Sequence, residues 1–174
     1  MEPGPVRLYP ARMHLYAIAL GSNRRHGRFG TPEAIVRAAA LSLGGDIRLI
    51  ALSPLFATAA MGDRGRRFAN AAATIETALT PPALLARLKQ VERAFGRRRG
   101  KRWGARVLDL DILLWSGGRW RSHHPRLTVP HRALAERRFV LDPLVRVAPR
   151  WRLAGTARTV AHAHARLTRP SRVP

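Results

Sequence analysis

The feature that most constrains this chain is a hydrophobic segment that contains two aspartates. Residues 107–115 read VLDLDILLW, a run typical of a buried β-strand except for Asp109 and Asp111. Because side chains two apart in a strand point to the same side, both carboxylates project from one face and the neighbouring leucines pack on the other. Two adjacent carboxylates repel each other, so the pair requires a positive counterpart.

Two counterparts are consistent with this spacing. A hard divalent cation such as Mg²⁺ takes one or two carboxylates together with substrate phosphates. The alternative is ion pairing with arginine, because the 174-residue chain has 32 Lys and Arg against 10 Asp and Glu, a net charge of +22. All of these cations except Lys89 and Lys101 are arginines. The spacing alone does not distinguish a metal site from arginine pairing.

A strongly basic region leads into the aspartate strand. Between residues 87 and 106 the only acid is Glu92, among nine cations: Arg87, Lys89, Arg93, Arg97, Arg98, Arg99, Lys101, Arg102 and Arg106. Phosphoryl transfer uses such groups, since cations neutralise the charge that develops on phosphate oxygens. A basic balance also predicts an anionic partner, either nucleic acid or a phosphorylated small molecule. For any single arginine, a solvated surface position is the alternative.

Composition excludes several classes of protein. The chain has no cysteine, which excludes disulfides and thiolate metal sites. No apolar run approaches the roughly 20 residues of a membrane span, and the proline-rich N-terminus lacks the apolar core of a signal peptide. We therefore expect a cytoplasmic protein with a flexible arm at 1–13, one domain at 14–153 and a partly ordered tail at 154–174.

The order of the expected elements defines a fold class. Strands are predicted at 14–20, at 47–56 with a break near Pro54, at 68–77 and at the aspartates. Helices are predicted at 34–43 and 81–95, because Thr-Pro sequences mark helix starts and glycines follow the helix ends. The order β-α-β-β-α-β predicts an α+β fold, a ferredoxin-like antiparallel sheet with both helices on one face, followed by C-terminal additions.

Three further residues each have two interpretations. Trp103 interrupts the basic region and either stacks on a base or anchors its loop. His131 lies among arginines and either contacts a phosphate or is structural. Asn70 lies in an apolar strand, where an unpaired amide costs a few kcal/mol, so it is hydrogen-bonded either to backbone or to the polar edge of a ligand.

Seven blocks of this sequence, in order and near the expected spacing, resemble the hydroxymethyldihydropterin pyrophosphokinases of folate biosynthesis. The blocks are ALGSN at 19–23, FATAAMGD at 56–63, FANAAATIET at 68–77, LLARLKQVERAFGRRR at 84–99, RWGARVLDLDIL at 102–113, LTVPH at 127–131 and RRFVLDPL at 137–144. The resemblance implies a ferredoxin-like fold. It also implies transfer of a pyrophosphoryl group from ATP to 6-hydroxymethyl-7,8-dihydropterin, release of AMP and a requirement for two Mg²⁺ ions.

The same resemblance implies roles for individual residues. The catalytic residues are Arg97, Arg106, Asp109 and Asp111, and the two aspartates are also the metal ligands. The residues that bind ATP are Glu92, Arg99, Arg102, Trp103, Thr128, His131 and Arg137. The pterin lies between Phe68 and Phe139, with Asn70 and the backbone after Thr58 at its polar edge.

The chain departs from the usual family pattern at Ala59, Ala60, Lys89, Ala105 and Arg132. These departures leave open a divergent relative that binds pterin or nucleotide without turnover. A basic RNA-binding domain is another alternative, because the same fold order occurs in modules whose sheets stack bases on aromatic residues. Aromatics are only 6% of this chain and an acid pair repels a phosphate backbone, so we expect no specific nucleic-acid partner. The expected partners are ATP and the dihydropterin, bound by a monomer.

Overall fold

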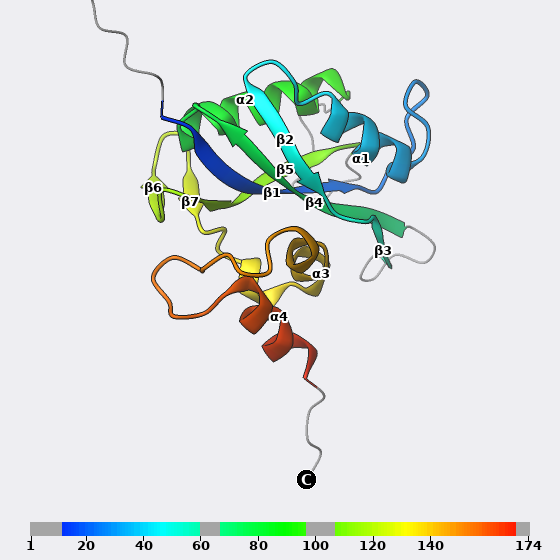
Figure 1. The fold of residues 1–174 in the computed structure, drawn as a ribbon. Helices are drawn as coiled ribbons and strands as arrows, with labels where there is room; N and C mark the ends of the chain where they lie inside the picture. The colour runs from blue at the N-terminus through cyan, green and yellow to red at the C-terminus, as the bar shows by residue number, and fades with distance from the viewer. Residues whose placement is uncertain (1–11, 60–66, 97–106, 170–174) are drawn as a thin grey trace, which may run out of the picture.

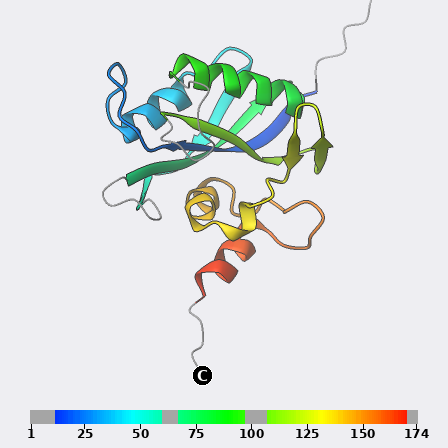
Figure 2. The ribbon, with the colours of Figure 1, turned by 180° about the vertical axis from the view of Figure 1, so that it is seen from behind.

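The computed structural model describes residues 12–59, 67–96 and 107–169, which form three layers (Figure 1). The middle layer is a sheet of β1 (His14–Ser22), β2 (Ile47–Leu52), β3 (Phe56–Ala59), β4 (Arg67–Thr77) and β5 (Asp109–Trp115). One face is covered by α1 (Pro32–Leu41) and α2 (Pro81–Ala94). On the other side lie α3 (Arg138–Val147) and α4 (Val160–Thr168), as the reverse view also shows (Figure 2). The segment from β5 to α3 contains the hairpin of β6 (Trp120–Ser122) and β7 (Leu127–Val129) and a 3-10 turn, η1 (Leu134–Glu136).

The main sheet has the strand order β2-β4-β1-β5, with every neighbouring pair antiparallel and β3 also paired with β4. With α1 and α2 on one face, this order confirms the predicted ferredoxin-like arrangement. The predicted break at Pro54 separates β2 from β3, because proline has no backbone N–H to give to a strand ladder. Strand β1 is central and pairs on both sides, whereas β5 lies at an edge of the sheet.

Threonine and proline begin the first two helices, as the sequence predicts. The Ala34 N–H donates to Thr31 Oγ1 at 3.3 Å, and Pro32 takes the first helical position. This helix therefore starts before the predicted residue 34 and ends at Leu41. Helix α2 ends before Gly96, whose φ of +83° costs a glycine little. Within the described ranges, no helix combines the length and the hydropathy that crossing a membrane requires.

Alternation along β1 divides the interior into two hydrophobic clusters. Ile18 and Leu20 belong to the larger cluster, which lies between the sheet and the pair α1 and α2. The opposite face of β1 carries the small residues Ala17 and Ala19, and Ala17 joins the smaller cluster under α3 and α4. Gly21 continues this row of small residues toward the end of the strand. The small row leaves space between the sheet and α3 at this end of β1.

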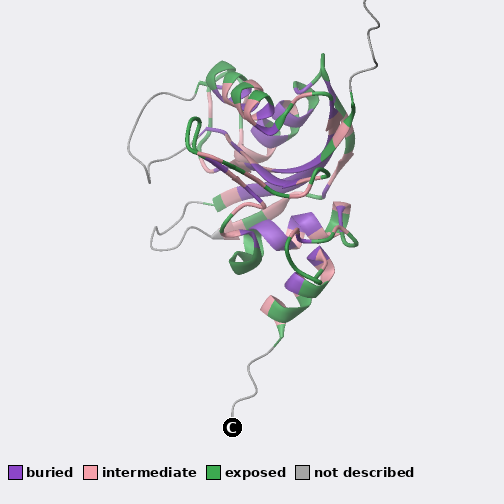
Figure 3. Cartoon of the chain, turned by 90° about the vertical axis from the view of Figure 1, so that its left-hand side faces the viewer, coloured by how far each residue is buried: buried purple, intermediate pink, exposed green. Residues whose placement is uncertain are grey.

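The tail at 154–174, for which the sequence analysis expects only partial order, contains a helix. Helix α4 is formed there, and its first turn has a reciprocal cap in which Thr159 Oγ1 and His162 Nδ1 each accept a backbone N–H. Val160 is fully buried in the smaller cluster, and Figure 3 shows buried residues in this layer as well as in the sheet. His164 Nε2 lies 2.9 Å from Asp142 Oδ1 on α3. The helix packs on α3 through these contacts, which the local sequence of the tail does not reveal.

Tyr16 provides a test of the larger cluster. Its ring is buried, its hydroxyl donates a 2.6 Å hydrogen bond to the carbonyl of Leu79, and burial raises its pKa above the ordinary value. The unfolded chain therefore loses the phenol proton at lower pH than the folded chain. Stability from this group is complete below the unfolded pKa of about 10 and falls as the pH rises beyond it.

We expect Tyr16→Phe to lower the free energy of unfolding by about 1–2 kcal/mol at neutral pH, because the hydrogen bond to Leu79 is lost. Above about pH 10 the variant should lose less further stability than the parent, because it has no phenol to ionise. Urea unfolding of both proteins at neutral and at alkaline pH measures the two effects. Equal alkaline losses in the two proteins would contradict the assignment.

Candidate active site

A cavity of about 270 Å³ lies between the sheet and α3, at the end of β1 that contains Gly21. Strands β1, β4 and β5 form its floor, and α3 and the segment after β7 contribute to its wall. Seven of the residues assigned by resemblance line this cavity: Phe68, Asn70, Asp109, Asp111, His131, Arg137 and Phe139. Residues that are far apart in the sequence are thus brought to one place.

The register of the sheet explains why these side chains meet. Gly21 of β1 pairs with Asn70 of β4 on one side and with Asp109 of β5 on the other. Residues directly opposite in antiparallel strands share a face, so Asn70 and Asp109 flank a position that has no side chain. A Cβ added at Gly21 would come 3.5 Å from Asn70 Oδ1. Gly21 therefore keeps the floor of the cavity open between the amide and the carboxylate.

The aspartate strand has the two-sided character that the sequence predicts. Asp109 and Asp111 are half-buried and both line the cavity, whereas Leu110 and Ile112 are buried in the larger cluster on the other face. Asp111 pairs with Ala19 of β1. The small side chain of Ala19 leaves space on the face of the sheet where the Asp111 carboxylate lies. Hard oxygen donors on one face of a polar cavity fit a divalent cation such as Mg²⁺. No group of three or more acidic, histidine or cysteine side chains with metal-ligand geometry occurs in the described ranges.

Asn70 is held in one orientation by β3. Its Nδ2 donates a 2.9 Å hydrogen bond to Thr58 Oγ1, and the residue is only 8% exposed. With the amide nitrogen engaged, Oδ1 lies on the side of Gly21 and faces the cavity as an acceptor. A buried acceptor of this kind favours a ligand with an N–H donor and penalises a ligand without one. The hydrogen bond that the sequence analysis requires for Asn70 is therefore a bond to a side chain, which neither of its two alternatives names.

Two aromatic rings and a cation complete the lining. Phe68 is half-buried at the start of β4, and Phe139 is 40% exposed in the first turn of α3. The guanidinium of Arg137 lies 5.7 Å from the centre of the Phe139 ring. An exposed phenylalanine at a cavity is a surface on which a flat ligand can stack. The cavity thus combines aromatic faces, an amide acceptor, two carboxylates and a cation.

His131 is fixed at the wall of the cavity by its own backbone. Its N–H donates to the carbonyl of Leu113 on β5 at 3.0 Å, and its Nδ1 accepts the N–H of Ala133 at 3.3 Å. When Nδ1 accepts, the proton of a neutral imidazole is on Nε2. His131 can therefore donate a hydrogen bond from Nε2 to an anionic ligand.

Glu92 lies away from the cavity, beneath the aspartate strand. Its carboxylate is 0% exposed, and Oε1 accepts the Leu110 N–H at 2.8 Å and the Lys89 ammonium at 2.6 Å. Lys89 Nζ also donates to the carbonyl of Leu110 at 3.3 Å. Because β5 is an edge strand, the N–H and the carbonyl of Leu110 have no partner strand on their outer side. These contacts give both groups a partner on α2. The pair Lys89 and Glu92 therefore holds in place the strand that carries the two aspartates.

The remaining assigned residues have different positions. Thr58 does not line the cavity, but its hydroxyl accepts a hydrogen bond from Asn70, which does. Thr128 lies on the β6–β7 hairpin and lines a separate hollow. The other assigned residues lie outside the described residues: Arg97, Arg99, Arg102, Trp103 and Arg106.

Sequence reasoning missed the structural role of two residues. It treats Gly21 only as part of a family block, and it treats Lys89 as a departure from the family pattern. The expected strand ends at residue 20, so no strand pattern marks Gly21, and only the structure places it inside β1. No local signal identifies the partner of Lys89, because the contact with Leu110 joins α2 to a strand that follows later in the chain.

Sequence comparisons with known proteins indicate a single family. The family described as 7,8-dihydro-6-hydroxymethylpterin-pyrophosphokinase matches residues 17–149. The 2-amino-4-hydroxy-6-hydroxymethyldihydropteridine pyrophosphokinase of Methylorubrum extorquens is 39% identical over 153 residues, which are 86% of this chain and 91% of that protein. The enzyme of the same name from Pseudomonas aeruginosa is 42% identical over 139 residues, 78% of this chain and 82% of its own.

A solved structure of similar fold is Plasmodium falciparum HPPK-DHPS, crystallised with SDX-DHP. The TM-score is 0.68 and the likeness covers 89% of this chain, but only 44% of the Plasmodium chain. At 12% identity this likeness concerns the fold alone.

Lys89 gives a test of the support beneath the aspartates. We expect Lys89→Met to lower the free energy of unfolding by about 1–3 kcal/mol, because the fully buried Glu92 carboxylate loses a cationic partner. Arg93→Met is the matched control, since Arg93 is an exposed cation on the same helix. Guanidinium unfolding of the parent and both variants measures the difference. An equal loss in both variants would show that charge on α2, and not the Glu92 contact, is responsible.

Proposed function

The chain belongs to the 7,8-dihydro-6-hydroxymethylpterin-pyrophosphokinase family, and from this premise we propose how its cavity carries out the reaction. The reaction is the transfer of the pyrophosphoryl group of ATP to 6-hydroxymethyl-7,8-dihydropterin, with release of AMP, in folate biosynthesis. One observation supports the assignment of this chemistry to the cavity. The aspartate pair and the amide of Asn70 share one floor, on either side of Gly21, so a ligand read by Asn70 lies beside the carboxylates.

The pterin is placed over Asn70, between Phe68 and Phe139. A flat bicyclic ring stacks on aromatic faces, and both phenylalanines line the cavity. The Oδ1 atom of Asn70 is an acceptor for an N–H group on the polar edge of the ring, and Thr58 holds the amide in that orientation. Burial of the pair makes a mismatched ligand costly, since the acceptor would then remain without a partner.

The nucleotide phosphates are placed beside Asp109 and Asp111. These carboxylates are suited to hold Mg²⁺, and we propose that two ions bind here with ATP; Mg²⁺ neutralises phosphate charge when it is bound. His131 and Arg137 reach the same cavity and contribute donors to phosphate oxygens. Attack of the pterin hydroxyl on the β-phosphorus requires alignment and charge neutralisation more than a strong base.

The other expected nucleotide contacts remain proposals. Glu92 is buried against Leu110, so its described contacts support the aspartate strand, and a direct role with ATP requires an additional contact. Thr128 lies on the hairpin beside the cavity. The family resemblance is the basis for the roles of five further residues: Arg97, Arg99, Arg102, Trp103 and Arg106. Four further expectations also stay predictions: a monomeric state, a cytoplasmic location, the absence of a specific nucleic-acid partner, and the division of the chain at residues 13 and 153.

The aspartate pair provides the first test of this assignment. We expect Asp109→Asn or Asp111→Asn to lower pterin-dependent AMP release from ATP by at least about 10²–10³-fold, because each change removes an anionic metal ligand. The circular dichroism spectrum should not change, because both side chains face the cavity. Asp46→Asn, at an exposed aspartate before β2, is the matched control and should keep parent activity. Full activity in either cavity variant would exclude the metal assignment.

Asn70 provides a separate test of pterin binding. We expect Asn70→Leu to lower kcat/KM for the pterin by about 10- to 100-fold, with little change in the KM for ATP, because an acceptor in a sheltered site is lost. Thr74→Val is the control: Thr74 is equally buried on β4 but does not line the cavity. Steady-state AMP release at varied pterin and varied ATP separates the two constants. A selective rise in the KM for ATP would place the nucleotide, and not the pterin, at Asn70.

A further inference from the structure

A hydrogen-bonded pair outside the cavity joins the last two helices. Nε2 of His164 on α4 lies 2.9 Å from Oδ1 of Asp142 on α3. An ionised carboxylate only accepts hydrogen bonds, so the imidazole donates from Nε2. The side chains are 28% exposed at His164 and 21% exposed at Asp142, so the bond is largely sheltered from water. A sheltered bond to a charged acceptor is stronger than a bond between neutral groups.

Helix α3 connects this contact to the cavity. Phe139 is in the first turn of the helix, three residues before Asp142, and the next residue, Val140, also lines the cavity. The N–H groups of Val140 and Leu141 donate to the carbonyl of Arg137 at 3.1 and 3.0 Å, so this turn is hydrogen-bonded. Because an α-helix is rigid over one turn, a displacement of Asp142 also moves the Phe139 ring.

The sheet gives α3 a smooth surface to pack on. The members of the smaller cluster on β1 and β4 are Ala17 and Ala72, which have no side chain beyond Cβ. Hydrophobic contacts are not directional, so packing on alanines stabilises the helix without fixing its exact position along the sheet. A hydrogen bond is directional, and the bond from His164 to Asp142 therefore supplies a positional constraint that the sheet does not.

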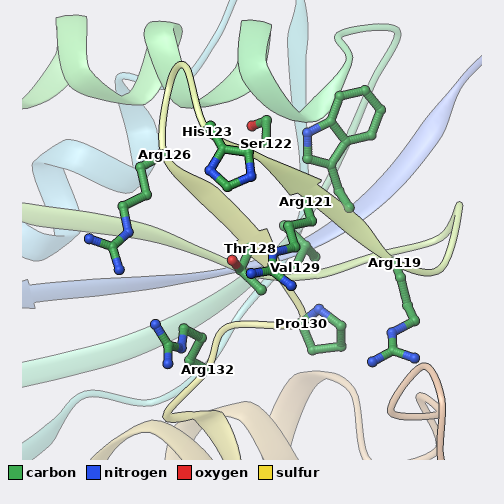
Figure 4. A pocket seen from close by; sticks show the side chains of 10 residues that line it. Arg119, Arg121, Ser122, His123, Arg126, Thr128, Val129, Pro130 and Arg132 are labelled. Atoms are coloured by element: carbon green, nitrogen blue, oxygen red, sulfur yellow. The ribbon is translucent and has the colours of Figure 1, made fainter.

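Helix α4 is a fixed support for this constraint. Val160, its first residue, is fully buried, and the Val160 N–H donates to the carbonyl of Trp151 at 2.9 Å. The segment between α3 and α4 also lies beside the β6–β7 hairpin, since a Cβ added at Gly155 would come 2.9 Å from Arg119 Nη1. Figure 4 shows Arg119 pointing toward this segment. The start of α4 is thus attached to the body of the protein.

The other ionic contact that the structure describes for Asp142 cannot replace His164. Asp142 Oδ2 lies 3.7 Å from Arg138 Nε, and the Arg138 side chain is 65% exposed. An exposed ion pair within one helix contributes little stability. Arg138 also belongs to α3 itself, so it moves with the helix. Of these two partners, only His164 joins Asp142 to another element.

We propose that the hydrogen bond between His164 and Asp142 positions Phe139 against the pterin, so that α4 controls pterin affinity from outside the cavity. This role rests on the proposed function, which places the pterin between Phe68 and Phe139. Neither Asp142 nor His164 lines the cavity, so both are positioning residues. His164 also lies beyond residues 17–149, which match the family. Its role is therefore a property of this chain that the family match does not supply.

The first measurement is made on the full chain without a ligand. Amide hydrogen exchange is followed by NMR in the parent, in His164→Leu and in His164→Gln. We expect His164→Leu to speed exchange of the Val140 and Leu141 amides by about fivefold or more, because α3 opens more readily without its bond to α4. His164→Gln should restore slow exchange, since glutamine keeps a side-chain N–H donor. Arg166→Leu, at an exposed position of α4, is the matched control and should leave these rates unchanged.

The second measurement concerns the pterin. Steady-state AMP release at saturating ATP gives kcat and the KM for the pterin, and thermal unfolding establishes that each variant is folded at the assay temperature. We expect His164→Leu to raise the KM for the pterin by about 3- to 10-fold, with a smaller change in kcat, because a displaced ring stacks less well. His164→Gln should restore the KM. In Phe139→Ala the same change at His164 should have no further effect, because no ring is left to position.

The two measurements separate failure of this role from failure of the proposed function. Unchanged exchange in His164→Leu would overturn the constraint on α3. Faster exchange with an unchanged KM for the pterin would leave His164 a structural residue only, and so overturn its positioning role. An equal rise in KM with and without the Phe139 ring would show that His164 acts through another residue. If the parent releases no pterin-dependent AMP, or if Phe139→Ala keeps the parent KM, the placement of the pterin is wrong. The role of His164 in pterin binding then falls with that placement, even where exchange shows that α4 holds α3.

Discussion

The pairing of β1 with β4 and β5 is the constraint on which the site depends. Gly21 lies between Asn70 and Asp109 because the two antiparallel ladders have a matching register at that point. If either ladder shifted by one residue, the side chains of the shifted strand would change faces. Asn70 or Asp109 would then point into the hydrophobic cluster under α1 and α2. The buried face of each strand opposes such a shift, since Ile18, Leu20 and Leu110 would then leave the core. Packing on one face thus determines the chemistry on the other.

The edge position of β5 creates a second requirement. An edge strand has backbone groups without a strand partner, and here α2 supplies partners to Leu110 through Lys89 and Glu92. The buried carboxylate is acceptable because an ammonium and a backbone N–H compensate it. A lysine that departs from the family pattern is therefore part of the support of the aspartate strand.

The excess of arginine has a spatial order. The carboxylates Asp109 and Asp111 share their cavity with His131 and Arg137, an arrangement that can hold a metal and phosphates together. On the neighbouring hairpin, arginines gather without a carboxylate among the lining residues. The first environment suits a metal-bound nucleotide, and the second is a basic surface on the hairpin that also carries Thr128. Both environments arise because the turns bring together arginines, which are abundant throughout the chain.

Much of the fold was predictable from local patterns. Thr-Pro pairs mark where α1 and α2 begin, alternation identifies β5, and the interval of two between Asp109 and Asp111 places both carboxylates on one face, because strand geometry has that period. The family blocks identify seven residues that the structure then brings to one cavity. The helix α4 was not predicted, since its burial depends on α3 and its own sequence, VAHAHARLT, mixes small apolar residues with histidine and arginine.

The sequence by itself determined the fold class, the family and the chemical types of group available for phosphate transfer, because these depend on short-range periodicity and on motifs that are contiguous along the chain. Only the tertiary structure decided that Gly21 opens the floor between Asn70 and Asp109, that Lys89 supports the strand of the aspartates, and that Thr128 lies with the hairpin arginines outside the cavity. These facts depend on register and packing between segments distant in sequence, and no local pattern specifies which distant groups will come within hydrogen-bonding distance.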